Sequence, residues 1–263
     1  MRPAPYRRQR NAQVHVFDAS ALPWLETPNP GLRLKPIRLD DERGEFLGLI
    51  EFDPFVKSGL HQHQGVATSF VLEGGLTDYH GALGLHEVGI NVRGSTHDAI
   101  SYVKTLLVSK LEGPVTYPLA AGVLSGIHAG SRHQDFRNPD PDVPPEVNVP
   151  IDALAPLETG VAGLRRQTIF DYAGSGGDRR MLQWQVRPET EVPAWQASGW
   201  VELWIRGGEI AINGTPAHAN CFVVIEPGAT VRIASPFGAL VIVWSEGRES
   251  RADGSAGANL FGF

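Results

Sequence analysis

Three histidines have a spacing that suits metal binding. His61 and His63 lie in KSGLHQHQGVATSFVLEGG, and His97 follows a glycine in GSTHDAIS. Residues i and i+2 of a β-strand face the same side, so His61 and His63 can bind one ion while Gln62 points away. A third imidazole from His97 would complete a facial set of nitrogen ligands with open positions for water, O2 or substrate. The alternative is that His61 and His63 are merely polar strand residues, because one His-x-His pair is weak evidence by itself.

The other histidines lack this context. His80 and His86 lie in the predicted hairpin DYHGALGLHEVG, where we expect turn or surface groups rather than ligands. Four more lie in segments without ligand spacing, where a solvated or locally hydrogen-bonded imidazole is the default: His15, His128, His133 and His218. The expected metal ligands are therefore His61, His63 and His97 alone.

The segments around these histidines are predicted to be β-strands. Short runs rich in Val, Ile, Leu, Phe and Trp, such as FLGLIEF, AISYVKTLLV and CFVVIEPG, alternate with turns of Gly, Pro, Asn or Asp. Asn213-Gly214 predicts a tight hairpin turn, because both residues tolerate positive φ. Many short strands without long helical periodicity indicate an all-β barrel or jelly roll.

The sequence contains an internal repeat of this strand pattern. LETPNPGLR, starting at Leu25, is answered by LETGVAGLR, starting at Leu157, 132 residues later. The Gly-Gly turn at Gly74 is answered at Gly207 after 133 residues, and Gly94 is answered by Gly228 after 134. This nearly constant offset indicates duplication of a whole domain.

The duplication sets the expected domain boundaries. We expect an N-terminal metal-binding barrel over residues 1–130, a proline-rich linker over residues 131–150 and a C-terminal barrel over residues 151–263. The segment SRHQDFRNPDPDVPPEVNVP contains prolines that disfavour both helix and inner strand, which is typical of an extended linker.

Alignment of the two copies predicts that only the first binds metal. Aligning Gly74 with Gly207 places Ala194 opposite His61 and Gln196 opposite His63, and aligning Gly94 with Gly228 places Val231 opposite His97. Every ligand position is then lost, so we expect one ion per chain. The indoles of Trp195, Trp200 and Trp204 are expected to make the second barrel apolar, either as core packing or as an aromatic pocket.

Composition excludes several classes of function. The chain has 23 Lys and Arg against 29 Asp and Glu, a formal charge of −6 without a long block of either sign, so nucleic acid is not an expected partner. No run of about 18 apolar residues predicts a membrane span, and no signal-peptide stretch follows MRPAPYRRQR. Cys221 is the single cysteine, which excludes an intrachain disulfide and a thiolate zinc cluster. We expect a soluble, cytoplasmic protein.

The histidine pattern resembles the two sequence motifs of the cupin superfamily. It is most similar to the ChrR-type cupins, whose aspartate, His-Gly turn, arginine and G-x-x-H are matched by Asp78, His80-Gly81, Arg93 and Gly94–His97. The opening LPWLETPNPGL also resembles small cupin dioxygenases that cleave β-diketones or aromatic ketones. The resemblance covers most of residues 15–117 and, more weakly, residues 150–247. It implies two tandem cupin barrels of the jelly-roll, double-stranded β-helix type, and a homodimer.

One departure from the cupin pattern concerns the fourth ligand. Most cupins have a glutamate four or five residues after the second histidine, where this chain has Ala67 and Thr68. The proline of the second motif is replaced by Arg93. What remains is a set of three neutral imidazoles, similar to the all-histidine iron sites of the diketone-cleaving branch.

The resemblance implies two functions, and the residues leave a third open. The first is an Fe(II) dioxygenase that cleaves a carbon–carbon bond in a small diketone or hydroxy-ketone, with Thr68 as a group that could orient water near the ion. The second is a non-catalytic sensor or regulatory module with Zn(II), although the histidine and paired cysteines of the ChrR anti-sigma region have no counterpart here. Ni(II) or Mn(II) would also suit the ligands. The third is a structural protein that binds no ion.

Overall fold

The computed structural model describes residues 13–78, 81–116, 146–172, 179–251 and 259–263. The described chain divides into two compact units. The first barrel is built from residues 23–150, and the second from residues 13–22 and 151–263. Both consist of strands joined by turns, with short 3-10 helices at Ala19–Ala21 and Ile151–Ala153, which confirms the expected all-β class. No helix in these ranges is long and apolar enough to cross a bilayer.

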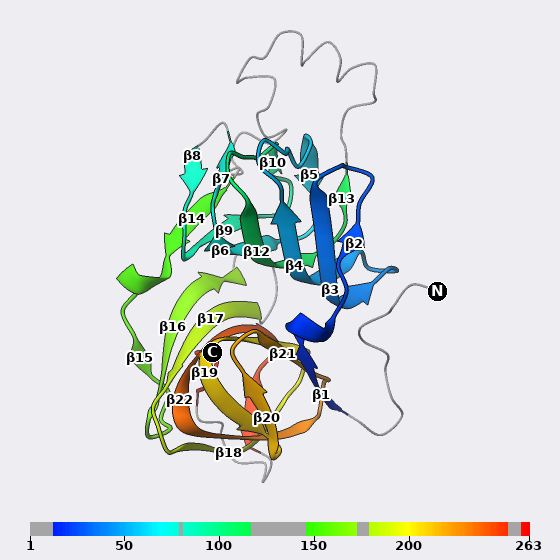
Figure 1. Ribbon diagram of the computed structural model, residues 1–263. Helices are drawn as coiled ribbons and strands as arrows, with labels where there is room; N and C mark the ends of the chain where they lie inside the picture. The colour runs from blue at the N-terminus through cyan, green and yellow to red at the C-terminus, as the bar shows by residue number, and fades with distance from the viewer. Residues whose placement is uncertain (1–12, 79–80, 117–145, 173–178, 252–258) are drawn as a thin grey trace. The chain divides into compact units, whose positions relative to one another are not determined.

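The first barrel contains one large sheet and two small ones. The large sheet has the order β14-β9-β6-β12-β4-β3-β2, and the small sheets have the orders β10-β5-β13 and β11-β7-β8 (Figure 1). The strands of the large sheet are β2 (Leu25–Glu26), β3 (Leu32–Asp40), β4 (Glu45–Phe52), β6 (Ala67–Glu73), β9 (Glu87–Asn91), β12 (Thr105–Glu112) and β14 (Val147–Pro150). The small sheets are formed by β5 (His61–His63), β7 (Leu76–Asp78), β8 (Gly81–Leu83), β10 (Thr96–His97), β11 (Ile100–Ser101) and β13 (Val115–Thr116).

Alternation along the strands of the large sheet places apolar side chains inside the first barrel. Ile50 of β4 pairs with Leu34 of β3 on one side and with Leu107 of β12 on the other. Leu107 in turn pairs with Val71 of β6. Directly opposite residues of antiparallel strands share a face, so these side chains form one row across the sheet. This row is part of the inner wall that faces the histidines.

The segment expected as a linker contributes a strand to the first barrel. β14 pairs with β9 in the register Val147↔Ile90 to Pro150↔Glu87. The linker prediction for residues 131–150 is therefore wrong at its end, because Val147 and Val149 can pair with an open strand edge despite the prolines before them. Residues 131–145 lie outside the described part of the chain.

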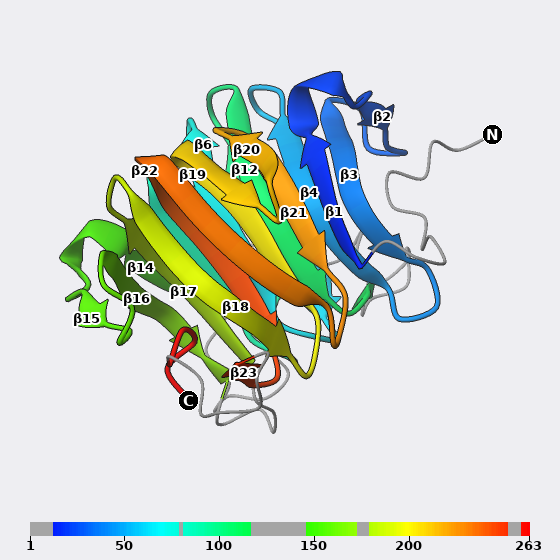
Figure 2. The same cartoon turned by 90° about the horizontal axis from the view of Figure 1, so that it is seen from below.

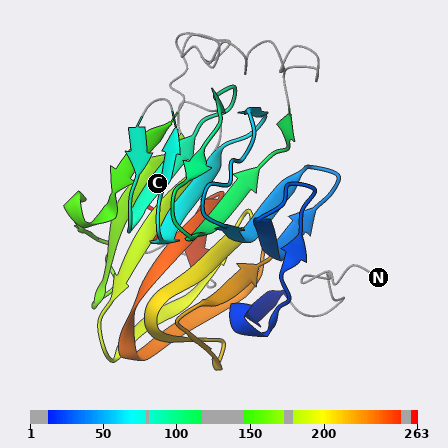
Figure 3. The ribbon, with the colours of Figure 1, turned by 45° about the horizontal axis from the view of Figure 1, so that its top comes forward.

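The second barrel is dominated by one ten-stranded sheet. Its main path is β1-β21-β19-β22-β17-β16-β15, and β18, β20 and β23 pair beside it (Figure 2). The bounds are β1 (Val14–Asp18), β15 (Leu157–Glu158), β16 (Leu164–Asp171), β17 (Arg179–Val186), β18 (Thr190–Ala197), β19 (Val201–Ile212), β20 (Thr215–His218), β21 (Cys221–Ile225), β22 (Thr230–Glu246) and β23 (Glu249–Arg251). The long yellow β19 and orange β22 lie side by side in Figure 3.

The N-terminal strand belongs to the second barrel. β1 pairs antiparallel with β21 from Val14↔Ile225 to Asp18↔Cys221 (Figure 2). These residues were expected in the first barrel, because they are adjacent to it along the chain; that expectation is wrong. The alternating pattern VHVFD suits any half-buried strand, and β1 covers an edge of β21 that would otherwise be unpaired.

Two predicted turns, Asn213-Gly214 and Gly207-Gly208, differ in the structure. Asn213 and Gly214 both have positive φ, 49° and 82°, and connect β19 to β20, which confirms the tight hairpin. Gly207-Gly208, in contrast, is not a turn but a bulge within β19. Gly208 has φ 78°, and a Cβ atom there would clash with the carbonyl oxygen of Gly238. The two glycines therefore allow β19 to bend and continue beside β22.

The interior of the second barrel is filled by aromatic and aliphatic side chains. Phe261 is fully buried, stacks on Trp184 at a ring-centroid distance of 5.9 Å and meets Trp195 edge-on at 5.5 Å. Trp184 Nε1 donates a hydrogen bond to the Leu260 carbonyl oxygen at 3.1 Å. Trp195 is thus core packing, which was the simpler of the two expectations. Residues 260 and 261 are part of one buried cluster with the strands of this barrel.

The packing of Phe261 predicts a large local contribution to stability. Phe261→Ala should lower the unfolding free energy of the second barrel by about 3–5 kcal/mol, because it removes a buried ring and leaves a cavity. Denaturant unfolding followed by tryptophan fluorescence measures this, since five of the six tryptophans lie within residues 151–263. Phe237→Ala is the matched control, because Phe237 is 75% exposed. Equal losses from both variants would show that Phe261 is not anchored in the core.

Candidate metal centre

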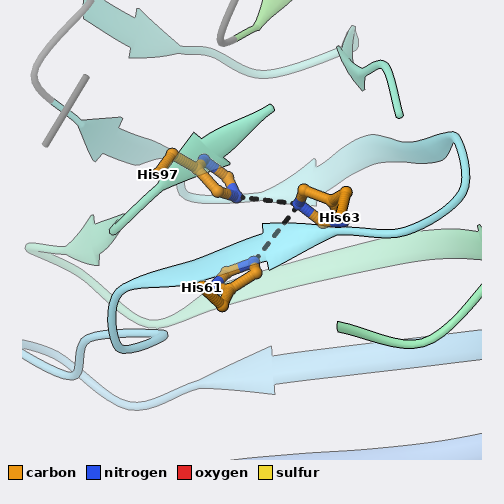
Figure 4. Close-up of side chains that lie close together, drawn as sticks. All are labelled: His61, His63 and His97. Carbon is orange, nitrogen blue, oxygen red and sulfur yellow. Dashed lines mark hydrogen bonds between the residues drawn. The ribbon is translucent and has the colours of Figure 1, made fainter. Parts of the chain in front are cut away.

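The three predicted ligands converge in the first barrel. β10 pairs antiparallel with β5 so that His97 lies directly opposite His61, and His63 follows on the same side of β5. The Nε2 atom of His63 lies 3.2 Å from Nε2 of His61 and 3.2 Å from Nε2 of His97 (Figure 4). All three residues are buried, with exposed fractions of 8%, 5% and 7% for His61, His63 and His97. A cluster of three imidazoles from two strands is therefore present where the spacing predicted it.

The spacing of the three nitrogens fits a single ion. Nitrogen ligands about 2.1 Å from a metal are separated by about 3.0 Å in an octahedral and about 3.4 Å in a tetrahedral arrangement. The observed separations of 3.2 Å lie between these values. Three Nε2 atoms so close together in a buried place have too few protons to satisfy one another fully, whereas one cation would satisfy all three lone pairs.

The surroundings keep these imidazoles in the form that binds metal. The Nδ1 atom of His61 lies 2.6 Å from the carbonyl oxygen of Gly59, which fits an Nδ1–H donor and leaves the lone pair on Nε2. Burial, and then the nearby His97, lowers the pKa of His61 to about 4. Burial and the charges of His97 and His61 hold the pKa of His63 well below its ordinary value. Both rings are therefore neutral at pH 7.

Two carboxylates lie behind His97, on the side away from the other histidines. Asp78 Oδ2 is 3.5 Å and Glu146 Oε2 is 3.7 Å from Nδ1 of His97. Burial, and secondarily the neighbouring Asp78, raises the pKa of Glu146 to about 7, although His97 acts in the opposite direction. Carboxylates in this position fix the orientation of a metal-binding imidazole. Because they face Nδ1 and not Nε2, they do not replace the missing cupin glutamate as a direct ligand.

Glu146 was not identified from the sequence. It directly precedes β14, in the segment that was interpreted as a linker, and only the pairing of β14 with β9 brings it to His97. Asp78 was named only for its place in the ChrR-type pattern. The only sequence signal for this role was that Glu146, an acidic residue, directly precedes the alternating segment VNVP.

The remaining predicted groups are not in the cluster. Thr68 pairs with Lys110 and Ile90, and its neighbours Ala67 and Ser69 are the residues of β6 that line the cavity beside the histidines. Alternation puts Thr68 on the opposite face of β6, so the structure does not bring it to the site. His86 has φ 63° in a turn and stacks on Phe70, with a ring-centroid distance of 6.1 Å.

The other histidines are likewise elsewhere or not described. His15 lies 3.4 Å from Glu226, and His218 is near Cys221 in the second barrel. His80, His128 and His133 lie outside the described residues.

A cavity of about 730 Å³ opens beside the three histidines. Its wall comes from the inner face of β3, β4, β6 and β12 and from the small sheets, and most of its side chains are apolar. The candidate centre is thus buried among protein atoms and still has space for a second molecule next to it.

The equivalent place in the second barrel has different residues from those expected. β18 pairs with β22 through Trp195↔Val231, just as His61 pairs with His97 in the first barrel. His61 and His63 therefore correspond to Trp195 and Ala197, and the alignment with Ala194 and Gln196 was wrong by one residue. A shift of one residue exchanges the two faces of a strand.

In the corrected register the residues at the three ligand positions still cannot bind a metal ion. Trp195, Ala197 and Val231 are all buried in its apolar core, and among the described residues no metal-binding cluster occurs there. Gln196 points the other way and donates a hydrogen bond to Thr230.

Comparison with known proteins agrees with this geometry. Residues 12–116 match the family of ChrR cupin-like domains. No curated protein matches the chain at a significant level.

Solved structures with the same fold span nearly the whole chain. A putative dioxygenase from Nostoc punctiforme has a TM-score of 0.70 and 13% identity, covering 91% of this chain and 83% of its own. Oxalate decarboxylase from Bacillus subtilis has a TM-score of 0.62 and 10% identity, covering 95% of this chain and 81% of its own. At these identities the likeness shows the fold alone. Residues 12–116 therefore match the ChrR cupin-like domains, and the chain as a whole shares the fold of these two solved structures.

Proposed function

We propose that the first barrel is the mononuclear metal centre of a dioxygenase that cleaves a carbon–carbon bond in a diketone or hydroxy-ketone. The observation that carries this proposal is the set of three buried imidazoles at the wall of a large cavity, with Nε2 of His63 3.2 Å from Nε2 of both His61 and His97. A facial set of three nitrogen ligands leaves positions for a bidentate substrate and for O2. The fold shared with a putative dioxygenase supports the same reaction class.

The residues of the site divide into metal ligands, groups that orient a ligand, and an apolar wall. His61, His63 and His97 would hold the ion through Nε2, and Fe(II), when bound, would polarise the two substrate oxygens and supply electrons for reaction with O2. Asp78 and Glu146 orient His97 from behind. The apolar wall keeps water from the reacting atoms. For pentane-2,4-dione the balance is one diketone and one O2 to one acetic acid and one methylglyoxal, with both oxygen atoms retained in the products.

A second candidate is favoured by the match of residues 12–116 to the ChrR cupin-like domains. In that case the same three histidines would hold Zn(II), and the cavity would bind a ligand without turnover. Zinc has no redox chemistry, so the two candidates differ in whether O2 is consumed. Ni(II) and Mn(II) also suit the ligand set and remain in the proposal.

The proposed metal centre predicts how many ions each chain binds. Protein purified without an affinity tag should contain one divalent ion per chain, because among the described residues only those of the first barrel bring nitrogen ligands together. His61→Ala and His97→Ala should each reduce occupancy at least about tenfold, since two imidazoles hold an ion poorly. His86→Ala is the matched control and should keep full occupancy. Elemental analysis decides this: two ions per chain, or equal losses from all three variants, would show that the ligands are misassigned.

The carboxylates behind His97 give a further prediction. Asp78→Asn and Glu146→Gln should each weaken metal affinity by about 10–100-fold, because each replaces a carboxyl group that faces Nδ1 of His97. Competition with a chelator of known affinity measures the change, and Asp41→Asn, at an exposed turn, is the control. Unchanged affinity in both variants would mean that His97 is oriented by its strand alone.

The proposed reaction predicts O2 consumption. Fe(II)-loaded protein should take up one O2 per diketone cleaved, whereas Zn(II)-loaded protein should take up none. An oxygen electrode with a panel of β-diketones and α-hydroxyketones provides the measurement, and His63→Ala is the matched inactive control. Iron demonstrably bound without any uptake across the panel would favour the sensor function.

A further inference from the structure

The cavity beside the histidines is far larger than a small diketone needs. Its volume is about 730 Å³, within the range of about 300–1,000 Å³ that is typical for ligands of drug size. Pentane-2,4-dione would fill roughly a quarter of such a space, on the measure of liquid volume. The remaining volume is not explained by the metal centre.

The wall of this space is mainly aliphatic and aromatic. Ile50 and Phe52 of β4, Leu34 of β3 and Leu107 of β12 face it from the large sheet, and Leu76 faces it from β7. Ile50 is partly exposed although it lies on the inner face of the sheet, because its side chain borders the cavity rather than another core residue. In the second barrel the corresponding interior is filled by protein. The first barrel thus has an apolar inner surface that the described residues leave uncovered.

The polar side chains of the wall are already bonded within the protein. Thr27 Oγ1 donates to the Leu32 carbonyl oxygen at 2.8 Å, and the Ser58 hydroxyl accepts from the Ala99 amide at 3.0 Å. Ser69 and Ser109 bond to each other at 2.8 Å. These groups therefore have little hydrogen-bonding capacity left for a ligand.

Asn91 is the exception. It lies at the end of β9, opposite Ala67, and lines the cavity. Its exposed fraction is 6%, and its buried Oδ1 atom has no hydrogen-bond partner among the described residues. A buried amide oxygen without a partner is costly and needs an explanation, and a ligand that brings a hydrogen-bond donor into the cavity supplies one.

We propose that the natural ligand of this site has a long apolar body and a chelating head group that includes a hydrogen-bond donor such as a hydroxyl. The head lies at the three histidines, its donor bonds to Oδ1 of Asn91, and the body lies against Leu34, Ile50 and Leu107. This substrate class rests on the proposed metal centre, but it replaces the small diketone by a medium- or long-chain one. Each buried methylene increases affinity by about fourfold, so the apolar wall discriminates strongly by chain length.

Isothermal titration calorimetry with metal-loaded protein tests the chain-length preference. Pentadecane-2,4-dione should bind at least about 100-fold more tightly than pentane-2,4-dione. Ile50→Trp should weaken binding of the long diketone at least tenfold and leave the short one unchanged. The indole takes up space beside β4 of the large sheet, whereas the histidines that hold the head group lie on β5 and β10 of a small sheet. Leu85→Trp adds the same indole at an exposed site outside the cavity and should change neither affinity. Thermal melting of each variant confirms that it is folded.

The role of Asn91 is tested by removing its carboxamide at nearly constant size. Asn91→Leu should weaken binding of an α-hydroxyketone by about tenfold, because its hydroxyl can donate to Oδ1 of Asn91. It should leave the two diketones unchanged, because a chelated diketone has no donor for this oxygen. Gln196→Leu removes a carboxamide of the second barrel, outside the cavity, and should leave all these affinities unchanged. Metal content of each variant is measured in the same sample, so that a loss of metal is not taken for a loss of ligand contact.

The outcomes separate this inference from the proposed function. Bound metal with equal affinity for the two diketones would overturn the long-chain substrate class and leave the metal centre intact. Tight binding of the long diketone by protein that holds no metal would support the apolar site and contradict the proposed reaction. Weaker binding in Leu85→Trp to the same degree as in Ile50→Trp would also overturn the inference.

Discussion

The antiparallel pairing of β10 with β5 is the interaction on which the candidate site depends. It places His97 opposite His61, and two backbone hydrogen bonds hold the turn before it: the His63 amide donates to Ser95 and the Gly94 amide donates to His63. Gly94 has φ 90°, a conformation that other residues rarely adopt. A small change in this turn would separate the Nε2 atoms, because all three histidines lie on the short paired strands β5 and β10.

The two barrels show how one pairing can have opposite consequences. In the first barrel the pair at this position is His61 and His97, beside an open cavity. In the second barrel it is Trp195 and Val231, and Phe261 packs against the indole. The backbone arrangement is retained while the side chains determine whether the interior binds a ligand or becomes core. The same fold therefore provides a site in one half and a closed, apolar interior in the other.

Burial and electrostatics act together at the first site. Burial alone favours neutral imidazoles, as the lowered pKa values of His61 and His63 show, and a neutral imidazole is the form that coordinates a cation. The carboxylates of Asp78 and Glu146 stand on the far side of His97, where they offset the positive charge that an ion would bring. The apolar wall completes the arrangement, because low polarity around the cavity strengthens each of these charge interactions.

Four features could be predicted from the sequence: the strand class, the duplication, the Asn213-Gly214 hairpin and the convergence of His61 with His63. The duplication is visible as a repeat at a nearly constant offset. The others depend on local patterns, namely the period of two along a strand and the backbone freedom of a turn. Only the tertiary structure decided which strands are partners. It assigned β1 to the second barrel, brought Glu146 to His97 through β14, turned Thr68 away from the cavity and replaced Ala194 by Trp195 at the position of His61. Local periodicity does not specify pairing or register, because any strand edge can accept a segment with the right alternation and a shift of one residue exchanges its faces.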